Sequence, residues 1–416
     1  MISKTFFLFY SISRQLWVRA SLISLLAVFA AAISPLFAPF MPNSVFAKID
    51  EATVRSLLDI LANSMLAVTT FSLTIMVTTQ LAVSQQITPR AHRVLREDPR
   101  TQIVLATFVG AFVFAMTGIV MLQTGIAGSA SLPVLYIAAL IVVGLVIVAI
   151  LRWIGHLSSL GSVEETTRKV ELEARDAMRR RMETPFLGGR RRVDLDVPPK
   201  TSVIPAERSG YIQHMDVAAA QACLIKYNAA IWVEAMPGDW VGEGEAVALY
   251  SGAEMDDSIE ATLSDIFTIG DTRTFAQDAG FGASVLTEIA ERALSPSTND
   301  PMTAIDIITR QLALLEDWSE EIEPEDVAAP NVYVPPIDIA GWVDSAFHPI
   351  ARDGAAFVEV GLHVQHALTR LSRHRVSAVA DAARLTAHRA LREAELGLRI
   401  EADLARVRAA APDALS

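Results

Sequence analysis

The sequence "LANSMLAVTTFSLTIMVTTQLAVSQQITPRAHRVLREDPR", residues 61–100, decides the fold of this chain. Its first part, 61–86, has no charged residue and is longer than the roughly 20 residues with which an apolar helix crosses a bilayer. Its second part, 87–100, contains four arginines. A long apolar segment followed by an arginine cluster is typical of a membrane helix that ends at the cytoplasmic surface. The sequence therefore predicts a membrane protein.

Three further segments have the length and composition of membrane spans. Together with the first they give four predicted spans, at about 16–40, 57–83, 103–125 and 132–154. The linker at 84–102 and the stretch after about 155 are rich in arginine, so the positive-inside rule places both in the cytoplasm. We therefore predict a multi-pass protein of the bacterial inner membrane, in contact with the lipid bilayer, with both termini cytoplasmic.

The first hydrophobic segment has a second interpretation. Basic residues, an apolar stretch and the small residues Val45 and Ala47 also resemble a secretory signal with its cleavage site. The apolar region is longer than the usual core of a signal, and Pro35 and Pro39 are typical of a helix end. Both interpretations leave residue 48 outside and the large carboxy-terminal part inside.

The second span carries a polar face. Offsets of seven, four and four place Asn63, Thr70, Thr74 and Thr78 on one side of a helix. In lipid such groups face another helix or water, because an unpaired polar atom in hydrocarbon is costly. Two readings stay open: the face packs against another helix, or it lines an aqueous path.

Composition divides the chain into a membrane part and a soluble part. Residues of the hydrophobic types make up 52% of the chain, yet 20% of its residues are charged, and these concentrate after about residue 160. A formal net charge of −12 argues against nucleic acid as a partner. The single cysteine, Cys223, excludes an intramolecular disulfide and a multi-cysteine metal cage, and we interpret it as a packing residue.

We expect three regions: a transmembrane domain over 1–155, a juxtamembrane basic helix and linker over 156–192, and a cytoplasmic α+β domain over 193–416. In the last, strands near 210–214, 230–235 and 245–250 enclose a helix at about 216–226. The hairpin "MPGDWVGEGEAVALY" resembles that of small barrel-sandwich modules, but it has no lysine for attaching a cofactor. We interpret it as a structural or assembly module, followed by amphipathic C-terminal helices.

A polar turn between two helices is the candidate ligand site. In "RALSPSTNDPMTAIDIITRQLALL", residues 292–315, Pro296 ends one helix, and Asp300 with Pro301 begins the next as N-cap and first helical residue. Capping does not explain why so many polar residues crowd this turn, and such groups can bind a cation or a small polar ligand. The candidate ligand-binding residues are Ser295, Ser297, Asn299, Asp300, Thr303 and Asp306.

Several of these stretches together resemble one bacterial family. The second and third spans with their linker, "RSGYIQHMD", "PGDWVGEGEAVA" and "RALSPSTNDPMTAI" are similar to the predicted membrane proteins of domain of unknown function 2254. The likeness extends from the first span to about residue 370. It implies a multi-pass inner-membrane protein, and it brings no activity and no catalytic residues.

No catalytic site or cofactor is assigned, and we expect a protein that is not an enzyme. Glu359, His363 and His366 have helical spacings that could hold a metal, but Arg370 on the same face would repel a cation, so we assign no metal. Two functions remain open for a protein that we expect to be a homo-oligomer. One is a channel or transport-type protein with a cytoplasmic regulatory domain, and the other is a membrane-anchored sensor or scaffold that binds a small ligand or a protein partner.

Overall fold

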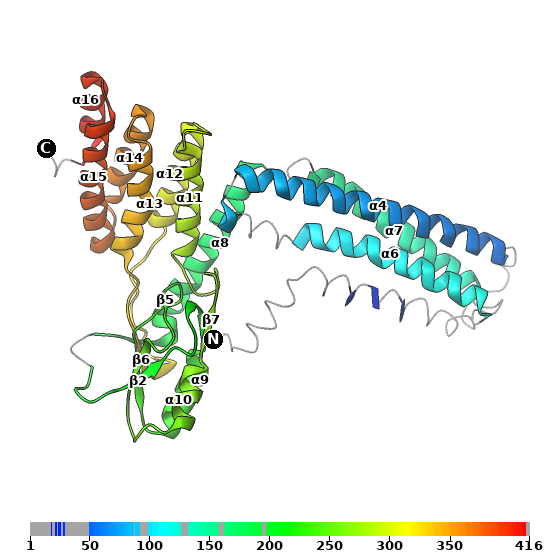
Figure 1. The fold of residues 1–416 in the computed structure, drawn as a ribbon, viewed down its shortest axis with the longest axis horizontal. Coiled ribbons are helices and arrows are strands. Elements are labelled where there is room, and N and C mark those ends of the chain that lie inside the picture. Colours follow the sequence, from blue (N-terminus) through cyan, green and yellow to red (C-terminus); the bar gives the residue numbers. More distant parts are fainter. Residues whose placement is uncertain are drawn as a thin grey trace. The chain divides into compact units, whose positions relative to one another are not determined.

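A computed structural model of the protein describes residues 50–86, 88–91, 99–125, 132–157, 162–193 and 197–412, together with a few positions between 18 and 29. The chain forms two compact units (Figure 1). The membrane unit lies within Phe9–Gln86 and His92–Glu165. The C-terminal unit includes Thr166–Ser416 and also Ile87–Ala91, from the linker that follows the second predicted span.

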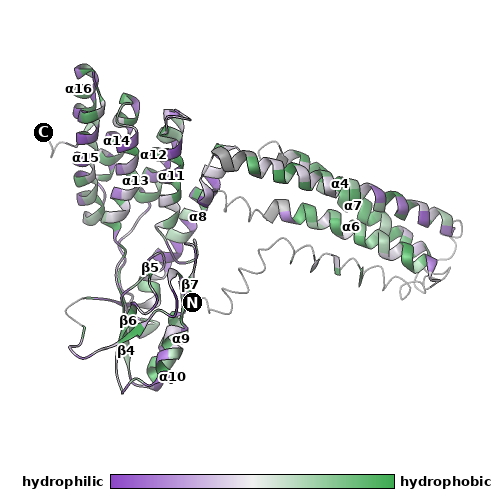
Figure 2. Cartoon of the chain, viewed as in Figure 1, coloured by the Kyte–Doolittle hydropathy of each residue, from purple (hydrophilic) through white to green (hydrophobic). Residues whose placement is uncertain are grey.

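The membrane unit contains three described helices that are long and apolar enough to cross a bilayer: α4 (Glu51–Gln86), α6 (Pro99–Gln123) and α7 (Leu132–Leu157). They coincide with three of the predicted spans, and Figure 2 shows the apolar character along α6 and α7. The first predicted span, 16–40, lies almost entirely outside the described residues. The core of this unit contains Leu58 of α4, Phe108 and Phe114 of α6 and Leu135 of α7, all essentially inaccessible.

Helix α8 (Val163–Glu183) begins the C-terminal part, and Ser162 caps it by accepting from the Glu165 backbone N–H at 3.1 Å. A short 3-10 turn, η3 (Pro185–Gly188), and strand β1 (Gly189–Arg191) follow within the stretch predicted as a linker. No local sequence pattern indicates this turn, because Phe186 and Leu187 both have positive φ, which bulky residues rarely adopt. Phe186 is fully buried, so packing accounts for the unusual backbone.

Two sheets form the β part of the C-terminal unit. The five-stranded sheet has the order β1-β8-β4-β6-β2, and the three-stranded sheet has the order β5-β3-β7. Their remaining strands are β2 (Ser202–Pro205), β3 (Gly210–Met215), β4 (Ala230–Val233), β5 (Trp240–Val241), β6 (Ala246–Ser251), β7 (Phe267–Gly270) and β8 (Ala329–Val334). Strands β3, β4 and β6 and helix α9 (Val217–Lys226) confirm the elements predicted there, and the structure shows Asp216 as the N-cap of α9, accepting from the Ala219 backbone N–H. Helix α10 (Asp257–Ser264) packs on α9 and β2.

Six helices complete this unit. They are α11 (Phe281–Leu294), α12 (Pro301–Glu316), α13 (Ile339–Asp353), α14 (Val358–Leu371), α15 (Ser377–Gly397) and α16 (Glu401–Ala410). Between α12 and α13 the chain returns to the sheet as β8, which lies between β1 and β4 and runs parallel to both. The helices and the sheet are therefore parts of one α+β unit, joined by β8, an interior strand of the larger sheet.

Candidate functional site

The polar face of α4 lies opposite the face that packs on the other described helices. The buried side of α4 is formed by Val54, Leu58, Leu61 and Met65. At 100° per residue, the four predicted polar residues lie on the other side of the helix. All four, Asn63, Thr70, Thr74 and Thr78, are exposed within the described part of the chain.

The threonines of this face satisfy their hydroxyl donors within α4. Thr70 donates to Leu66 O at 2.9 Å, Thr74 to Thr70 O at 3.0 Å and Thr78 to Thr74 O at 2.9 Å. A hydroxyl that donates to the carbonyl four residues earlier retains lone pairs that can accept further hydrogen bonds. The three threonines therefore present a row of acceptor oxygens, and each of their hydroxyl donors is satisfied.

The predicted ligand turn connects α11 and α12, and its polar groups bond largely to one another. Ser295 Oγ donates to Arg292 O at 2.6 Å and lies 3.2 Å from Ser297 Oγ. Asn299 has a positive φ of 52°, a conformation that asparagine tolerates better than most residues. These contacts build a compact turn at the end of α11.

Asp300 is the N-cap of α12, as its sequence position predicts. Its carboxylate accepts from the Thr303 backbone N–H at 3.1 Å and from the Thr303 hydroxyl at 2.6 Å. These bonds, the hydroxyl first, lower the pKa of Asp300. Asp306 pairs instead with Arg310 at 2.7 Å, and Arg310 also reaches Glu171 of α8 at 2.5 Å. The structure thus brings Asp300 together with Thr303 and directs Asp306 toward α8.

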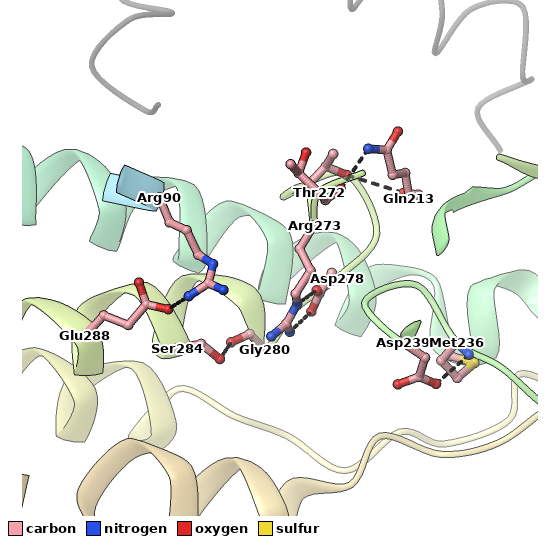
Figure 3. Close-up of polar contacts among 11 residues, drawn as sticks. Arg90, Gln213, Met236, Asp239, Thr272, Arg273, Asp278, Gly280, Ser284 and Glu288 are labelled. Carbon is pink, nitrogen blue, oxygen red and sulfur yellow. Dashed lines mark hydrogen bonds and ion pairs between the residues drawn. The ribbon is translucent and has the colours of Figure 1, made fainter. Parts of the chain in front are cut away.

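A loop that sequence reasoning did not single out, residues 271–280, connects the main parts of the C-terminal unit. Gln277 makes two hydrogen bonds with the backbone of Met215 in β3, at 2.8 and 3.1 Å. Gln213 of the same strand donates to Thr272 O at 2.7 Å (Figure 3). On the other side, Arg180 of α8 donates to Phe275 O at 2.9 Å. The loop is therefore held by both α8 and β3 immediately before α11 begins.

The same loop contains a charged pair whose carboxylate is buried. Arg273 binds both carboxylate oxygens of Asp278, at 2.7 and 3.1 Å, and Asp278 is 6% exposed (Figure 3). Burial raises the pKa of Asp278, although Arg273 acts in the opposite direction. Gly238, in the "PGDW" turn, has a φ of +106°, and a Cβ there would lie 2.4 Å from Asp278 Oδ2. The turn that suggested a barrel-sandwich hairpin thus packs directly against this aspartate.

Two further charged pairs could not be predicted from any local sequence pattern. Arg90, from the linker after α4, pairs with Glu288 of α11 (Figure 3). Arg181 of α8 and Glu321 form a buried pair at 2.6 Å, with side chains 2% and 4% exposed. Glu321 also accepts from the backbone N–H groups of Phe186 and Ile337, so its carboxylate is fully bonded. Contacts between residues so far apart in sequence leave no local pattern.

On the face of α14 that carries Glu359, His363 and His366, His363 Nδ1 lies 2.7 Å from Glu359 O. Within the described ranges, no three His, Cys, Asp or Glu residues gather in a way that could hold a metal ion. Cys223 is partly buried beside the β core, and burial raises the pKa of its thiol. A thiol held in its protonated form is a poor nucleophile.

Comparison with known proteins confirms the family that the sequence resembles. The family model described as predicted membrane protein (DUF2254) matches residues 13–370, which is most of the chain. The chain belongs to the DUF2254 family. Its curated relatives include an uncharacterized protein of Mycobacterium bovis and one of Mycobacterium tuberculosis, each 29% identical over 277 residues. That alignment covers 62% of this chain and 50% of each relative, so the chain matches about half the length of these proteins.

No solved structure matches the chain. The family is described as predicted membrane proteins, and three of the described helices are long and apolar enough to cross a bilayer.

Proposed function

We propose that this DUF2254 protein is an oligomeric channel or transport-type protein of the bacterial inner membrane, whose α4 helices line an aqueous path. The exposed polar face of α4 is the observation that carries this proposal. Within the described residues, no other element covers Asn63, Thr70 and Thr74. Polar groups at this depth favour water or a protein partner over lipid chains.

Several copies of α4 arranged around an axis would bring these faces together. In that arrangement the acceptor oxygens of Thr70, Thr74 and Thr78 replace part of the hydration of a solute, as rings of oxygen atoms do in channels. In this proposal, segment 16–40 is a further membrane span, both termini are cytoplasmic, and the protein is not an enzyme.

The C-terminal unit is the proposed regulatory domain. The linker residues Ile87–Ala91 directly follow α4 in sequence and belong to this unit, where Arg90 pairs with Glu288 of α11. A change in the position of α11 would therefore act on the end of α4. We also propose that the β unit is a barrel-sandwich-like module for assembly.

The test is flux through liposomes that contain the purified full-length protein. Replacing Thr70, Thr74 and Thr78 together by valine removes the acceptor oxygens at nearly constant volume, and we expect flux to fall while the oligomer still assembles. Thr69→Val is the matched control, because Thr69 also donates to the carbonyl four residues earlier, Met65 O at 2.6 Å, but is partly buried. Native protein that passes no ion or small solute under any gradient would overturn the channel and favour the membrane-anchored sensor or scaffold.

A further inference from the structure

A cavity of about 150 Å³ lies in the C-terminal unit, between α8, β3 and loop 271–280. Protein cavities of about this size can hold benzene, so about six non-hydrogen atoms fit inside. Its apolar wall consists of Ala177, Leu187, Met215, Val217 and Ala276. These residues provide a surface for a short aliphatic or ring-shaped body.

Most polar groups at the cavity already have partners. The side-chain amide of Gln277 hydrogen-bonds with the backbone of Met215. Arg181 donates to Glu321 and to Pro335 O. Arg180 differs from these two. Its guanidinium donates to the single carbonyl of Phe275 in the part of the chain that is described, which leaves further N–H donors.

The neighbouring arginines of α8 differ from Arg180, because each of them has a carboxylate partner. Arg175 pairs with Glu171 and Asp317, Arg179 with Asp176 and Arg181 with Glu321. Of the four arginines from 175 to 181, Arg180 has no carboxylate partner among the described residues, and it is the one of them that lines the cavity without an ion pair. A planar guanidinium is the side chain best suited to bind a carboxylate through two parallel hydrogen bonds.

We propose that this cavity binds a small organic monocarboxylate, with its carboxylate on Arg180 and its apolar body against Ala177, Met215 and Ala276. The hydroxyl of Thr184, which also lines the cavity, is a second donor for the carboxylate. Glu183 at the same cavity opposes a second negative charge, so a monocarboxylate is favoured over phosphate or a dicarboxylate. A carboxylate of about four carbons fills the available volume.

This site goes beyond the proposed channel and does not depend on it. A ligand there would touch α8 on one side and loop 271–280 on the other. The loop leads into α11, which holds Arg90 through Glu288. Ligand binding therefore has a direct structural route to the linker that follows α4.

The test measures binding of sodium butyrate to the full-length protein in detergent, by saturation-transfer NMR and by thermal stabilisation, against equal sodium chloride. We expect binding to the native protein and to Arg179→Gln, whose arginine is exposed and lies outside the cavity. Arg180→Gln should weaken binding by at least about tenfold, the effect of losing a charged hydrogen bond. Ala276→Leu, which fills the cavity and keeps Arg180, should abolish binding even if Arg180→Gln does not fold.

Three results would overturn the site. The first is no binding of butyrate or of any carboxylate with three to six carbons to the native protein. The second is equal binding to native protein, Arg180→Gln and Ala276→Leu. The third is binding of n-butanol or inorganic phosphate as tight as that of butyrate, because the proposal requires one negative charge and an apolar body.

Discussion

Arg90 and Glu288 form an ion pair across 198 residues of sequence, joining the linker after α4 to the middle of α11. The two residues belong to the same compact unit, and Thr88 supports the linker by accepting from the Ala91 backbone N–H at 3.3 Å. The pair itself is partly exposed and contributes at most about 1 kcal/mol. The pair matters because of where it lies: it favours a topology in which the linker after α4 and the C-terminal unit are on the same side of the membrane.

Cross-linking tests this relationship. With Cys223 replaced by alanine, cysteines placed at 90 and 288 should be joined within one chain by a short bis-maleimide reagent. A cysteine at Thr124, an exposed position at the end of α6, should not be joined to one at 288. Failure to cross-link positions 90 and 288 would contradict the contact. Equal cross-linking of both pairs would contradict the predicted topology.

Gly238 and Gly244 form a matched pair for testing the contact between the "PGDW" turn and Asp278. Both have positive φ, +106° and +81°, but only at Gly238 would an added Cβ meet another atom within 4 Å. Gly244→Ala should therefore cost about 1 kcal/mol of unfolding free energy, from backbone strain alone. Gly238→Ala should cost clearly more, because Asp278 is held by Arg273 and cannot move away freely. Unfolding of the full-length protein in detergent measures both, and equal losses would show that the turn does not press on Asp278.

The buried pair of Arg181 and Glu321 predicts a large effect from a small change. Glu321→Gln leaves the buried Arg181 charged without its counter-ion, and removal of one partner of such a pair costs about 3–5 kcal/mol. Arg179→Gln, at an exposed pair on the same helix, should change the unfolding free energy by less than about 0.5 kcal/mol. Similar effects from the two variants would indicate that the Arg181 site is open to water.

The sequence predicts what depends on short-range patterns. Uninterrupted apolar length identified α4, α6 and α7, and capping chemistry identified Asp300 at the start of α12. Helical spacing placed Asn63 and the threonines on one face, but it could not say that this face would lie opposite α6. That choice depends on which residues of α6 fit between Leu58 and Met65, and one chain segment does not contain this information.

Long-range contacts account for what the sequence did not predict. Glu321 is 140 residues from Arg181, and Asp278 meets a turn 40 positions earlier in the sequence. The cavity could not be predicted from the sequence either, because Arg180 is one of three consecutive arginines and nothing local distinguishes it from the other two. That Arg180 has no carboxylate partner among the described residues becomes visible only when the partners of Arg175, Arg179 and Arg181 are known.

Asp300 separates the two interpretations of the polar turn. As an N-cap, its replacement by alanine should cost about 1 kcal/mol, and Asp300→Asn should leave the unfolding free energy nearly unchanged at neutral pH, because asparagine caps as well as aspartate does. The Thr303 hydroxyl lowers the pKa of Asp300, so the folded state favours the ionised carboxylate. This stabilisation is present above the ordinary pKa of aspartate and is lost as the pH falls through the lowered value. Asp300→Asn should therefore reduce the loss of stability in acid, measured by unfolding at neutral and acidic pH.

A ligand site at the turn requires more than capping. If the carboxylate contacts a ligand together with Ser295, Ser297 and Asn299, Asp300→Asn should retain the melting temperature but fail to restore the phenotype of a deletion strain. Ser295 and Thr303 already bond to turn atoms, so a ligand would have to compete with Arg292 O and with the Asp300 carboxylate itself. Full rescue by Asp300→Asn, with an unchanged melting temperature, would mean that the negative charge serves no ligand and that the turn only begins α12.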